Sequence, residues 1–327
     1  MRVLITGGAG FVGSHLVDRH LDSGDEVVVV DDFSTGRHEN LRSDPTSRLT
    51  IIEARVEDYP DIGQIMEGVE RIYHLAAAVG VFHILERPLD AIRRNLGASE
   101  VIFKIAASQQ RRTVFTTTSE VYGKNTADAL AEGDDSIFGS TSLSRWLYGI
   151  TKAADECLAV AYHRERGLPI TVVRLFNTTG PRQTGAYGMV VPRFVQQALR
   201  NEPITVFGDG SQTRCFTNVY DAIEAIVRLA DCPNAVGKIV NVGQPREISI
   251  RHLAEVVQRI TGHSASIDFV DYETAYGPGF EDMRRRVPDV KFLHKLIGYV
   301  PSTPIEVTIE QIVREAAEPD QWRISRT

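Results

Sequence analysis

Short apolar runs alternate with amphipathic stretches over the first half of the chain. The apolar runs have the length of single strands, whereas the stretches between them carry apolar residues at intervals of three or four. Strands that alternate with helices predict an α/β fold with a doubly wound parallel sheet. We expect strands at 3–5, 27–30, 49–54, 71–75, 113–117 and 170–176, and helices at 12–21, 62–66, 88–108 and 144–167.

The pattern changes after residue 176. Proline and glycine become more frequent, the apolar runs shorten, and helical stretches at 190–200 and 250–261 lie between them. We therefore expect a larger domain over 1–176 and a smaller C-terminal substrate-binding lobe over 177–317, with some segments of the lobe returning to the sheet. The polar residues 318–327 predict a loose tail.

The composition narrows the class of protein. The 327 residues are 43% apolar, which suffices for a large core, and the net charge of −7 with dispersed basic residues argues against a nucleic-acid partner. No apolar run reaches the length of a membrane span, and the first strand begins too early for a signal peptide, so we expect a cytoplasmic protein without a membrane partner. The nine histidines show no metal-ligand spacing, and the three cysteines are scattered, so we expect no metal and reduced thiols.

The first apolar run leads directly into a glycine-rich turn. Gly7, Gly10 and Gly13 follow the strand, and a helical pattern starts among them. A strand, a glycine turn and a helix in this order are typical of the dinucleotide-binding unit of Rossmann folds. Gly7 permits the tight turn, Gly10 lets the backbone approach a pyrophosphate, and Gly13 lets the helix pack on the sheet. The helix N-terminus offers unpaired N–H groups to the phosphates.

An acidic pair ends the second apolar run. Asp31 and Asp32 follow about 20 residues after the glycines, where a carboxylate binds the adenosine ribose. Because a carboxylate there repels a 2′-phosphate, the sequence predicts NAD rather than NADP as the cofactor. The alternative is a tight turn that binds no ligand. The other residues expected at the cofactor are Phe11, Val12, Asp58, Leu75, Ala76 and Ala77.

A tyrosine and a lysine form the first candidate catalytic pair. Tyr148 and Lys152 lie four positions apart in the predicted helix 144–167 and therefore share a face. An ammonium beside a phenol favours the phenolate and lowers its pKa, which makes Tyr148 a candidate general base toward a sugar hydroxyl. Lys152 would also hold the nicotinamide ribose. The alternative is a chance pair on an amphipathic helix.

Hydroxyl and carboxyl groups follow the fifth predicted strand, at the edge where ligands bind in open α/β sheets. Thr118 and Ser119 offer hydroxyls that can share the substrate proton with Tyr148. Glu120 is the informative residue, because a carboxylate so close to the cofactor suggests acid–base chemistry at a second carbon atom. The alternative is a solvated loop glutamate.

Four motifs resemble those of one family. Up to about residue 313, the chain resembles the nucleotide-sugar branch of the extended short-chain dehydrogenase/reductase superfamily. Within that branch it is most similar to the UDP-glucuronate decarboxylases, also called UDP-xylose synthases. The motifs are Thr118-Ser119-Glu120-Val121-Tyr122-Gly123, Ile137-Phe138-Gly139 through Arg145-Trp146-Leu147-Tyr148, Tyr276-Gly277-Pro278-Gly279-Phe280-Glu281-Asp282, and Arg286-Val287-Pro288-Asp289.

The resemblance implies roles for individual residues. Tyr148 and Lys152 match the catalytic pair, and Ser119 and Glu120 match polar acid–base residues of the decarboxylases. Arg286 matches the arginine beside the sugar carboxylate, and a guanidinium suits a carboxylate because its fork is bidentate. The alternative for Arg286 is a solvated basic run. The other residues implied in binding the UDP-sugar are Asn177, Arg182, Val191, Arg214 and Asp282.

The implied reaction is the NAD-dependent decarboxylation of UDP-glucuronate through a 4-keto intermediate, giving UDP-xylose or the 4-keto pentose. Val79-Gly80-Val81 is more reminiscent of some sugar 4-epimerases. A UDP-sugar 4-epimerase, a 4,6-dehydratase and an NAD-sensing binding protein on the same fold therefore remain alternatives. The resemblance also implies a homodimer, with the helices near 90–108 and 145–166 at its interface.

Overall fold

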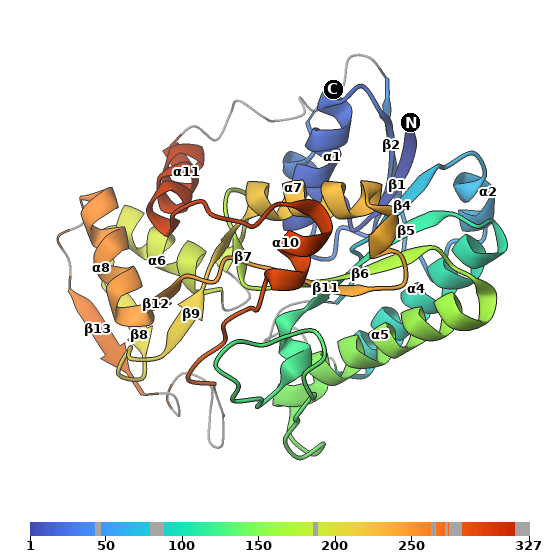
Figure 1. Ribbon diagram of the computed structural model, residues 1–327. Helices are drawn as coiled ribbons and strands as arrows, with labels where there is room; N and C mark the ends of the chain where they lie inside the picture. The colour runs from blue at the N-terminus through green and yellow to red at the C-terminus, as the bar shows by residue number, and fades with distance from the viewer. Residues whose placement is uncertain are drawn as a thin grey trace.

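The predicted strands form a single parallel sheet in the computed structural model, which describes residues 1–42, 47–78, 88–185, 189–262, 264, 266–271, 274 and 283–317. The six strands expected from the sequence are present, and a seventh joins them in the order β11-β6-β5-β4-β1-β2-β3 (Figure 1). The order reverses at β1, which confirms the doubly wound fold class. The strands are β1 (Arg2–Thr6), β2 (Glu26–Asp31), β3 (Leu49–Glu53), β4 (Arg71–His74), β5 (Arg112–Thr118), β6 (Ile170–Leu175) and β11 (Ile239–Val242).

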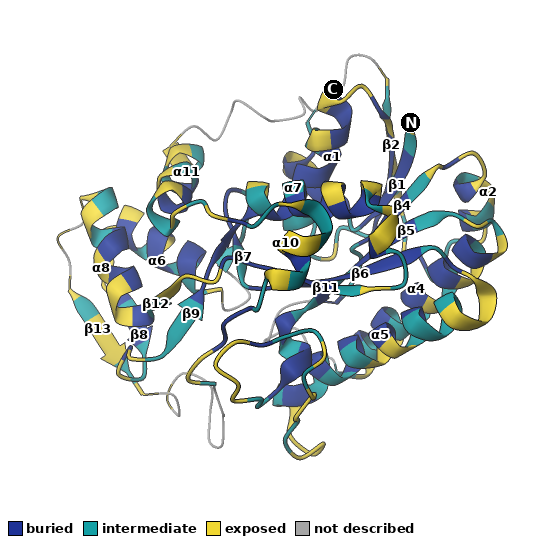
Figure 2. Ribbon diagram, in the orientation of Figure 1, coloured by how far each residue is buried: buried dark blue, intermediate teal, exposed yellow. Residues whose placement is uncertain are grey.

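Both faces of the sheet are covered by helices, which explains the continuous apolar runs of the strands. Side chains alternate along β2: Val27 and Val29 enter one core, whereas Val28 and Val30 enter the other. Figure 2 shows the central strands buried and the outer helix faces exposed. The helices of the first core are α1 (Phe11–Asp22), α7 (Val219–Asp231) and α10 (Lys291–Ile297), and those of the second are α2 (Ile62–Met66), α4 (Pro88–Ser108) and α5 (Leu147–Arg166).

The C-terminal half contributes to two separate cores. Its strand β11 pairs with β6, and its helix α7 packs on the sheet, so these segments return to the larger part. Helix α10 packs there as well, and most of the other segments build a smaller lobe with an apolar core of its own, at the left of Figure 1. The limits 1–176 and 177–317 stay a prediction. The lobe contains α6 (Val190–Leu199), α8 (Ile250–Thr261), α11 (Ile305–Ala317), the pair β8 (Ile204–Phe207) and β13 (Ile267–Val270), and the pair β9 (Thr213–Cys215) and β12 (Glu247–Ser249).

Within the described ranges, no helix is both long enough and apolar enough to span a bilayer.

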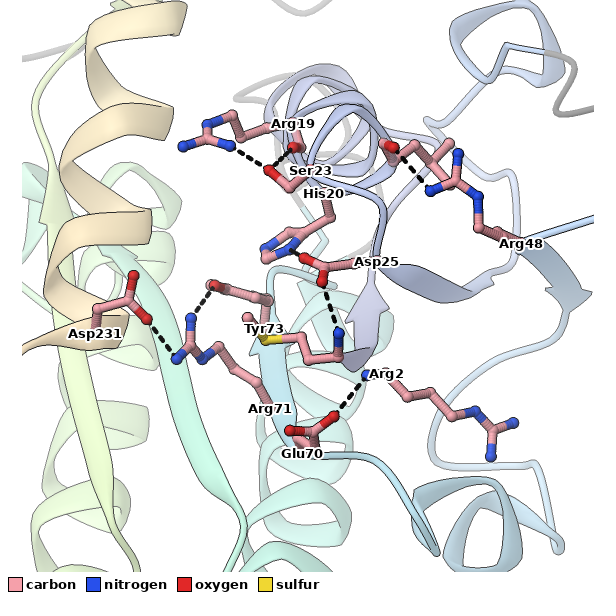
Figure 3. Close-up of polar contacts among 12 residues, drawn as sticks. Arg2, Arg19, His20, Ser23, Asp25, Arg48, Glu70, Arg71, Tyr73 and Asp231 are labelled. Atoms are coloured by element: carbon pink, nitrogen blue, oxygen red, sulfur yellow. Dashed lines mark hydrogen bonds and ion pairs between the residues drawn. The ribbon is translucent and has the colours of Figure 1, made fainter. Parts of the chain in front are cut away.

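A polar network ties the elements together at the amino-terminal edge of the sheet (Figure 3). Asp25 accepts a hydrogen bond from the amino group of Met1 at 2.8 Å and contacts Nδ1 of His20 at 2.7 Å. Arg71 joins this edge to α7 through Asp231 at 2.6 Å. Burial opposes the charge of Asp25, but the His20 and Met1 contacts outweigh it and lower the pKa of Asp25. The network thus holds elements together at the amino-terminal edge of the sheet, opposite to the carboxyl edge at which the sequence predicts ligands.

Buried histidines make the stability of the fold depend on pH. Burial lowers the pKa of His15 from 6.5 to about 4, lowers that of His74 to about 3, and also lowers that of His20. The unfolded chain therefore binds more protons than the folded chain once the pH falls below about 6.5. We expect the free energy of unfolding to fall by about 2 kcal/mol for each of His15 and His74 between about pH 7 and pH 5, measured by urea denaturation.

The variant His15→Gln isolates one of these contributions. The glutamine amide keeps a donor for the Pro181 carbonyl, which His15 contacts at 3.0 Å, but it cannot titrate. The stability of this variant should therefore depend less steeply on pH than that of the unmodified chain. Identical slopes would contradict the assignment.

Candidate active site

A cavity of about 440 Å³ opens at the carboxyl edge of the sheet. Its walls come from the turn after β1, the ends of the neighbouring strands, the start of α5, and segments of the C-terminal half. This is the edge at which the sequence predicts the ligands. The predicted site residues that line the cavity are Gly7, Gly10, Phe11, Val12, Gly13, Asp31, Asp32, Leu75, Ala76, Ala77, Thr118, Ser119, Glu120, Tyr148, Lys152, Asn177, Arg182 and Arg286.

Three other predicted residues are not among the described residues that line the cavity. Asp58 follows lining residues 54–57 without lining the cavity itself. Val191 packs its side chain in the core of the smaller lobe, so a contact with a nucleotide base would have to come from its backbone. Arg214 donates to the carbonyl of Thr213 at 2.8 Å. Asp282 and the Val79-Gly80-Val81 stretch lie outside the described residues.

The glycine turn forms a cradle that side chains would fill. A Cβ atom on Gly13 would lie 2.1 Å from the carbonyl oxygen of Gly7, and one on Gly7 would lie 2.8 Å from the nitrogen of Ala76. Gly7 also has a φ of +71°, which favours glycine. A Cβ on Gly10 would approach only the Gly7 oxygen, at 3.2 Å, and Gly10 lines the cavity. Gly7 and Gly13 are thus required by packing, whereas Gly10 leaves room for a pyrophosphate.

The acidic pair lies where a ribose would be held. Asp31 accepts backbone N–H groups from Ala9 at 2.9 Å and from Phe33 at 2.8 Å, which fixes its carboxylate at the cavity. Burial raises the pKa of Asp31, and the two N–H groups act in the opposite direction. Asp32 pairs with Arg94 of α4. Glycine cradle, helix N-terminus and paired acids together fit NAD.

Tyr148 and Lys152 both line the cavity, as the helical spacing predicted. Lys152 is 2% exposed, and its Nζ atom lies 3.5 Å from Oδ2 of Asp155. Burial raises the pKa of Tyr148, and the charges of Glu120 and Asp155 raise it further. The lowering by Lys152 that we expected from the sequence is therefore not found. The reason is that the ammonium lies beside a buried anion, which offsets its field.

Glu120 is held between two arginines. Its Oε2 atom accepts a hydrogen bond from Arg145 at 2.8 Å, and its Oε1 atom accepts one from Arg286. Burial favours the neutral carboxyl, but Arg286 and Arg145 outweigh it and lower the pKa of Glu120 to about 2. Arg286 is itself 4% exposed. The structure thus contradicts both alternatives, a solvated loop glutamate and a solvated basic run.

The turn that carries these groups is braced by a buried ion pair. Thr118 ends β5 and accepts the N–H of Glu120 at 3.2 Å, which caps the short 3₁₀ helix η2 (Ser119–Tyr122). The preceding Thr117 donates to Glu156 of α5 at 2.7 Å. Arg174 of β6 donates to the same carboxylate, at distances down to 2.6 Å. The hydroxyl turn and the catalytic helix are therefore connected through one carboxylate.

Asn177 and Arg182 lie at the side of the cavity nearest the smaller lobe. The amide of Asn177 donates to the carbonyl of Cys215 at 2.9 Å. Arg182 donates through its guanidinium to Asp18 of α1 and through its backbone to Glu315 of α11, both at 2.6 Å. Both residues connect the sheet domain to the lobe at the predicted substrate position.

Sequence reasoning did not assign a role to three residues of this arrangement. Arg145 lies three positions before Tyr148, a spacing that can place it one turn earlier on the same face, but the sequence does not show its partner. Asp155 carries no motif of its own. A Cβ on Gly149 would lie 2.6 Å from the carbonyl oxygen of Glu120, so this glycine permits the close approach of α5 to the turn.

Among the described residues, no group of three or more possible metal ligands occurs.

Substitutions in the glycine cradle separate binding from folding. We expect Gly10→Ala to keep the thermal stability of the protein but to weaken NAD binding by about tenfold or more, because Gly10 lines the cavity and its Cβ would approach only the Gly7 oxygen. Gly13→Ala should disturb folding itself. Gly63→Ala is the control, because a Cβ there meets no atom within 4 Å. Calorimetric titration with NAD⁺ and thermal melting measure the two effects, and unchanged affinity in Gly10→Ala would contradict the placement of the pyrophosphate.

Similarity to known proteins agrees with this site. The chain is 38% identical over 317 residues to the UDP-N-acetyl-alpha-D-glucosaminuronate decarboxylase of Bacillus cytotoxicus, covering 96% of this chain and 97% of that protein. It is 36% identical over 321 residues to UDP-glucuronic acid decarboxylase 1 of Arabidopsis thaliana, covering 96% of this chain and 69% of that protein.

A solved structure has the same fold. It is the UDP-glucuronic acid 4-epimerase from Bacillus cereus in complex with UDP-glucuronic acid and NAD, with a TM-score of 0.85 and 28% identity over 98% of this chain and 100% of that chain. Residues 3–243 match the NAD dependent epimerase/dehydratase family, which confirms the predicted cofactor and class of enzyme. The chain therefore belongs to the NAD dependent epimerase/dehydratase family.

Proposed function

We propose that the chain decarboxylates UDP-glucuronate through a 4-keto sugar, giving UDP-xylose or the 4-keto pentose. The observation that carries this proposal is the Arg145–Glu120–Arg286 cluster at the cavity. Two guanidiniums around one carboxylate provide a binding place for an acidic sugar, which an epimerase or dehydratase acting on a neutral sugar does not need. The similarity to two decarboxylases of UDP-uronic acids supports the same conclusion.

The substituent at C2 of the sugar is a second question. The relative from Bacillus cytotoxicus is named for a 2-acetamido sugar acid, whereas the relative from Arabidopsis thaliana is named for glucuronate. Both sugars carry the C6 carboxylate that the arginines would bind. UDP-N-acetylglucosaminuronate is therefore the second substrate to test.

The reaction begins with removal of a proton from the 4-hydroxyl of the sugar. Tyr148 takes this proton as its phenolate, a form that requires a lower pKa than Tyr148 has without ligands, and the hydroxyl of Thr118 shares the proton at the end of β5. A bound NAD would supply a reversible hydride acceptor for C4. Lys152 would hold the cofactor ribose. Gly10 and the start of α1 would hold the pyrophosphate, and Asp31 would hold the adenosine ribose.

The 4-ketone makes the C6 carboxylate part of a β-keto acid. The C5–C6 bond then breaks, carbon dioxide leaves, and the electron pair remains on the sugar as an enolate. The hydroxyls of Thr118 and Tyr148 can donate hydrogen bonds to the enolate oxygen. A proton must then reach C5, by way of Glu120 or water.

The charge of Glu120 limits how it supplies that proton. With a pKa of about 2 it is ionised and has no proton to give. A substrate carboxylate would compete with Glu120 for Arg286 and Arg145. Once these cations are shared, the burial of Glu120 is less compensated, so its pKa rises and it can hold a proton near C5.

A UDP-sugar 4-epimerase is the closest alternative. The fold shared with the UDP-glucuronic acid 4-epimerase favours it, because that protein also accepts an acidic sugar. A 4,6-dehydratase is the third possibility. The homodimer, the cytoplasmic location and the absence of nucleic-acid or membrane partners stay predictions.

The deciding experiment is incubation with UDP-glucuronate and NAD⁺, followed by mass spectrometry and chromatography of the nucleotide sugars. A product lighter by carbon dioxide is the expected result. An isomer of unchanged mass would replace the proposal with 4-epimerisation. UDP-N-acetylglucosaminuronate and UDP-glucose are tested in parallel, and loss of water from UDP-glucose would indicate a dehydratase.

Removing the phenol of Tyr148 tests the general base. We expect Tyr148→Phe to lower kcat by a factor of about 10² to 10⁴, since a positioned acid–base group contributes this much. The affinity for NAD⁺, measured by calorimetric titration, should stay nearly unchanged. Substantial turnover in this variant would show that another group takes the proton.

Neutralising Arg286 tests the carboxylate site. We expect Arg286→Gln to weaken binding of UDP-glucuronate by roughly 10- to 100-fold, which corresponds to the loss of a hydrogen bond between charged groups. Binding of UDP-glucose, which lacks the carboxylate, should change much less. Equal losses for the two sugars would place Arg286 elsewhere on the ligand.

A further inference from the structure

A fully buried carboxylate lies beside Lys152, and the proposed reaction does not use it. Asp155 follows Lys152 on α5 by three residues and has no exposed surface. Lys152 lines the cavity, whereas Asp155 is not among its described lining residues. Within the described part of the chain, neither oxygen of Asp155 accepts a hydrogen bond of normal geometry. Its ion pair with Lys152 at 3.5 Å is thus its principal polar contact.

A chain of polar groups from three other elements points toward Asp155. The Oγ1 atom of Thr6 accepts the N–H of Ala76 at 3.2 Å and lies 2.7 Å from Nδ1 of His74. Burial, and then the charge of Lys152, lower the pKa of His74 to about 3, so this histidine is neutral. The Thr6 hydroxyl can give its proton to Nδ1, and in that tautomer the imidazole hydrogen lies on Nε2.

In this tautomer, hydrogen-bond donation continues from His74 through Ser99 to the carboxylate of Asp155. Nε2 of His74 lies 3.4 Å from Oγ of Ser99 on α4, and a hydrogen on Nε2 makes Ser99 the acceptor. The hydroxyl proton of Ser99 is then available to Asp155, and Ser99 lowers the pKa of Asp155 against the larger raising effect of burial. In this tautomer each hydroxyl and ring N–H of the chain donates toward Asp155, which stabilises its ionised form.

The ammonium of Lys152 has little else to stabilise it. It lies 4.1 Å from the ring centroid of Phe115, an apolar partner that attracts cations through its π face. Burial lowers the pKa of Lys152, while Asp155 and then Glu156 raise it. Glu156 is already paired with Arg174 of β6. Asp155 is therefore the anion on which the charge of Lys152 depends most.

We propose that Asp155 is a positioning residue, which keeps the Lys152 ammonium charged and seated at the cavity. This inference rests on the role of Lys152 in the proposed function. The titratable and charged groups around the pair are Tyr148 and Glu156 on α5, His74 on β4, Arg174 on β6 and Glu120 on η2. Asp155 acts on both members of the catalytic pair, because it also raises the pKa of Tyr148.

The variant Asp155→Asn tests the proposal through the pH dependence of kcat/KM. It preserves the shape of the side chain and removes the charge. Burial then acts on Lys152 with less opposition, so the ammonium loses its proton at lower pH and the alkaline limb moves to lower pH. Tyr148 also loses a neighbouring anion, so the acid limb moves in the same direction. We expect each limb to shift by about one pH unit or more.

Two controls distinguish positioning from general damage. Glu165→Gln removes the same charge from an exposed position on the same helix and should leave the profile unchanged. A merely structural role of Asp155 would lower the activity of Asp155→Asn equally at all pH values. An unshifted profile of this kind would overturn the proposal.

A double-mutant cycle tests the pair without any turnover. Lys152→Met leaves the carboxylate buried without its cation, so it should lower the urea midpoint of unfolding. Adding Asp155→Asn to Lys152→Met should raise the midpoint again, because the orphaned charge is removed. If the decreases in urea midpoint of the two single variants simply add in the double variant, Lys152 and Asp155 are not coupled, and the proposal is overturned. Because this cycle needs no substrate, it remains informative even if UDP-glucuronate is not turned over.

Discussion

The site depends on one buried carboxylate, that of Glu156. It accepts the hydroxyl of Thr117 at the end of β5 and the guanidinium of Arg174 from β6, and it belongs to α5. The Glu156 carboxylate thus fixes the position of α5 relative to β5 and β6. Tyr148 and Lys152 lie two turns and one turn earlier on that helix, so their distance from the hydroxyl turn follows from this contact. Burying such a pair costs desolvation energy, which these several hydrogen bonds offset.

Around the Glu156 contacts, the charged side chains at or beside the cavity occur in oppositely charged groups. Glu120 has Arg145 and Arg286, Lys152 has Asp155, and Asp32 has Arg94. A ligand that enters the cavity therefore replaces existing partners as well as making new contacts. The pKa of Tyr148 is high without ligands because burial raises it most and the charges of Glu120 and Asp155 raise it further.

The fold was largely predictable from the sequence, because a strand buried on both faces is a continuous apolar run and the runs are separated by clear helices. The glycine cradle and the Tyr148–Lys152 pair were predictable because each is local in sequence. Arg145, Asp155 and the depressed pKa of Glu120 were not. They depend on contacts such as that of Arg286 with Glu120, 166 positions apart, which no local spacing encodes. The seventh strand, β11, was expected only as an unspecified segment returning to the sheet, because its partner β6 lies more than 60 residues away.

The arrangement also suggests how one frame serves different reactions. In the proposed reaction the hydroxyl turn and the tyrosine–lysine pair act on C4 of the sugar, with the cofactor in the glycine cradle, and forming a 4-ketone is common to decarboxylation, epimerisation and dehydration. The fate of the 4-ketone depends on the groups that reach C5 and C6. The proposal gives this place to a carboxylate and two guanidiniums, one of which comes from a C-terminal segment that pairs with the sheet domain through Leu130 and Pro288. A 4-ketone beside a carboxylate can lose carbon dioxide, so in the proposed reaction the way these groups hold the carboxylate helps to decide between decarboxylation and the return of hydride to C4.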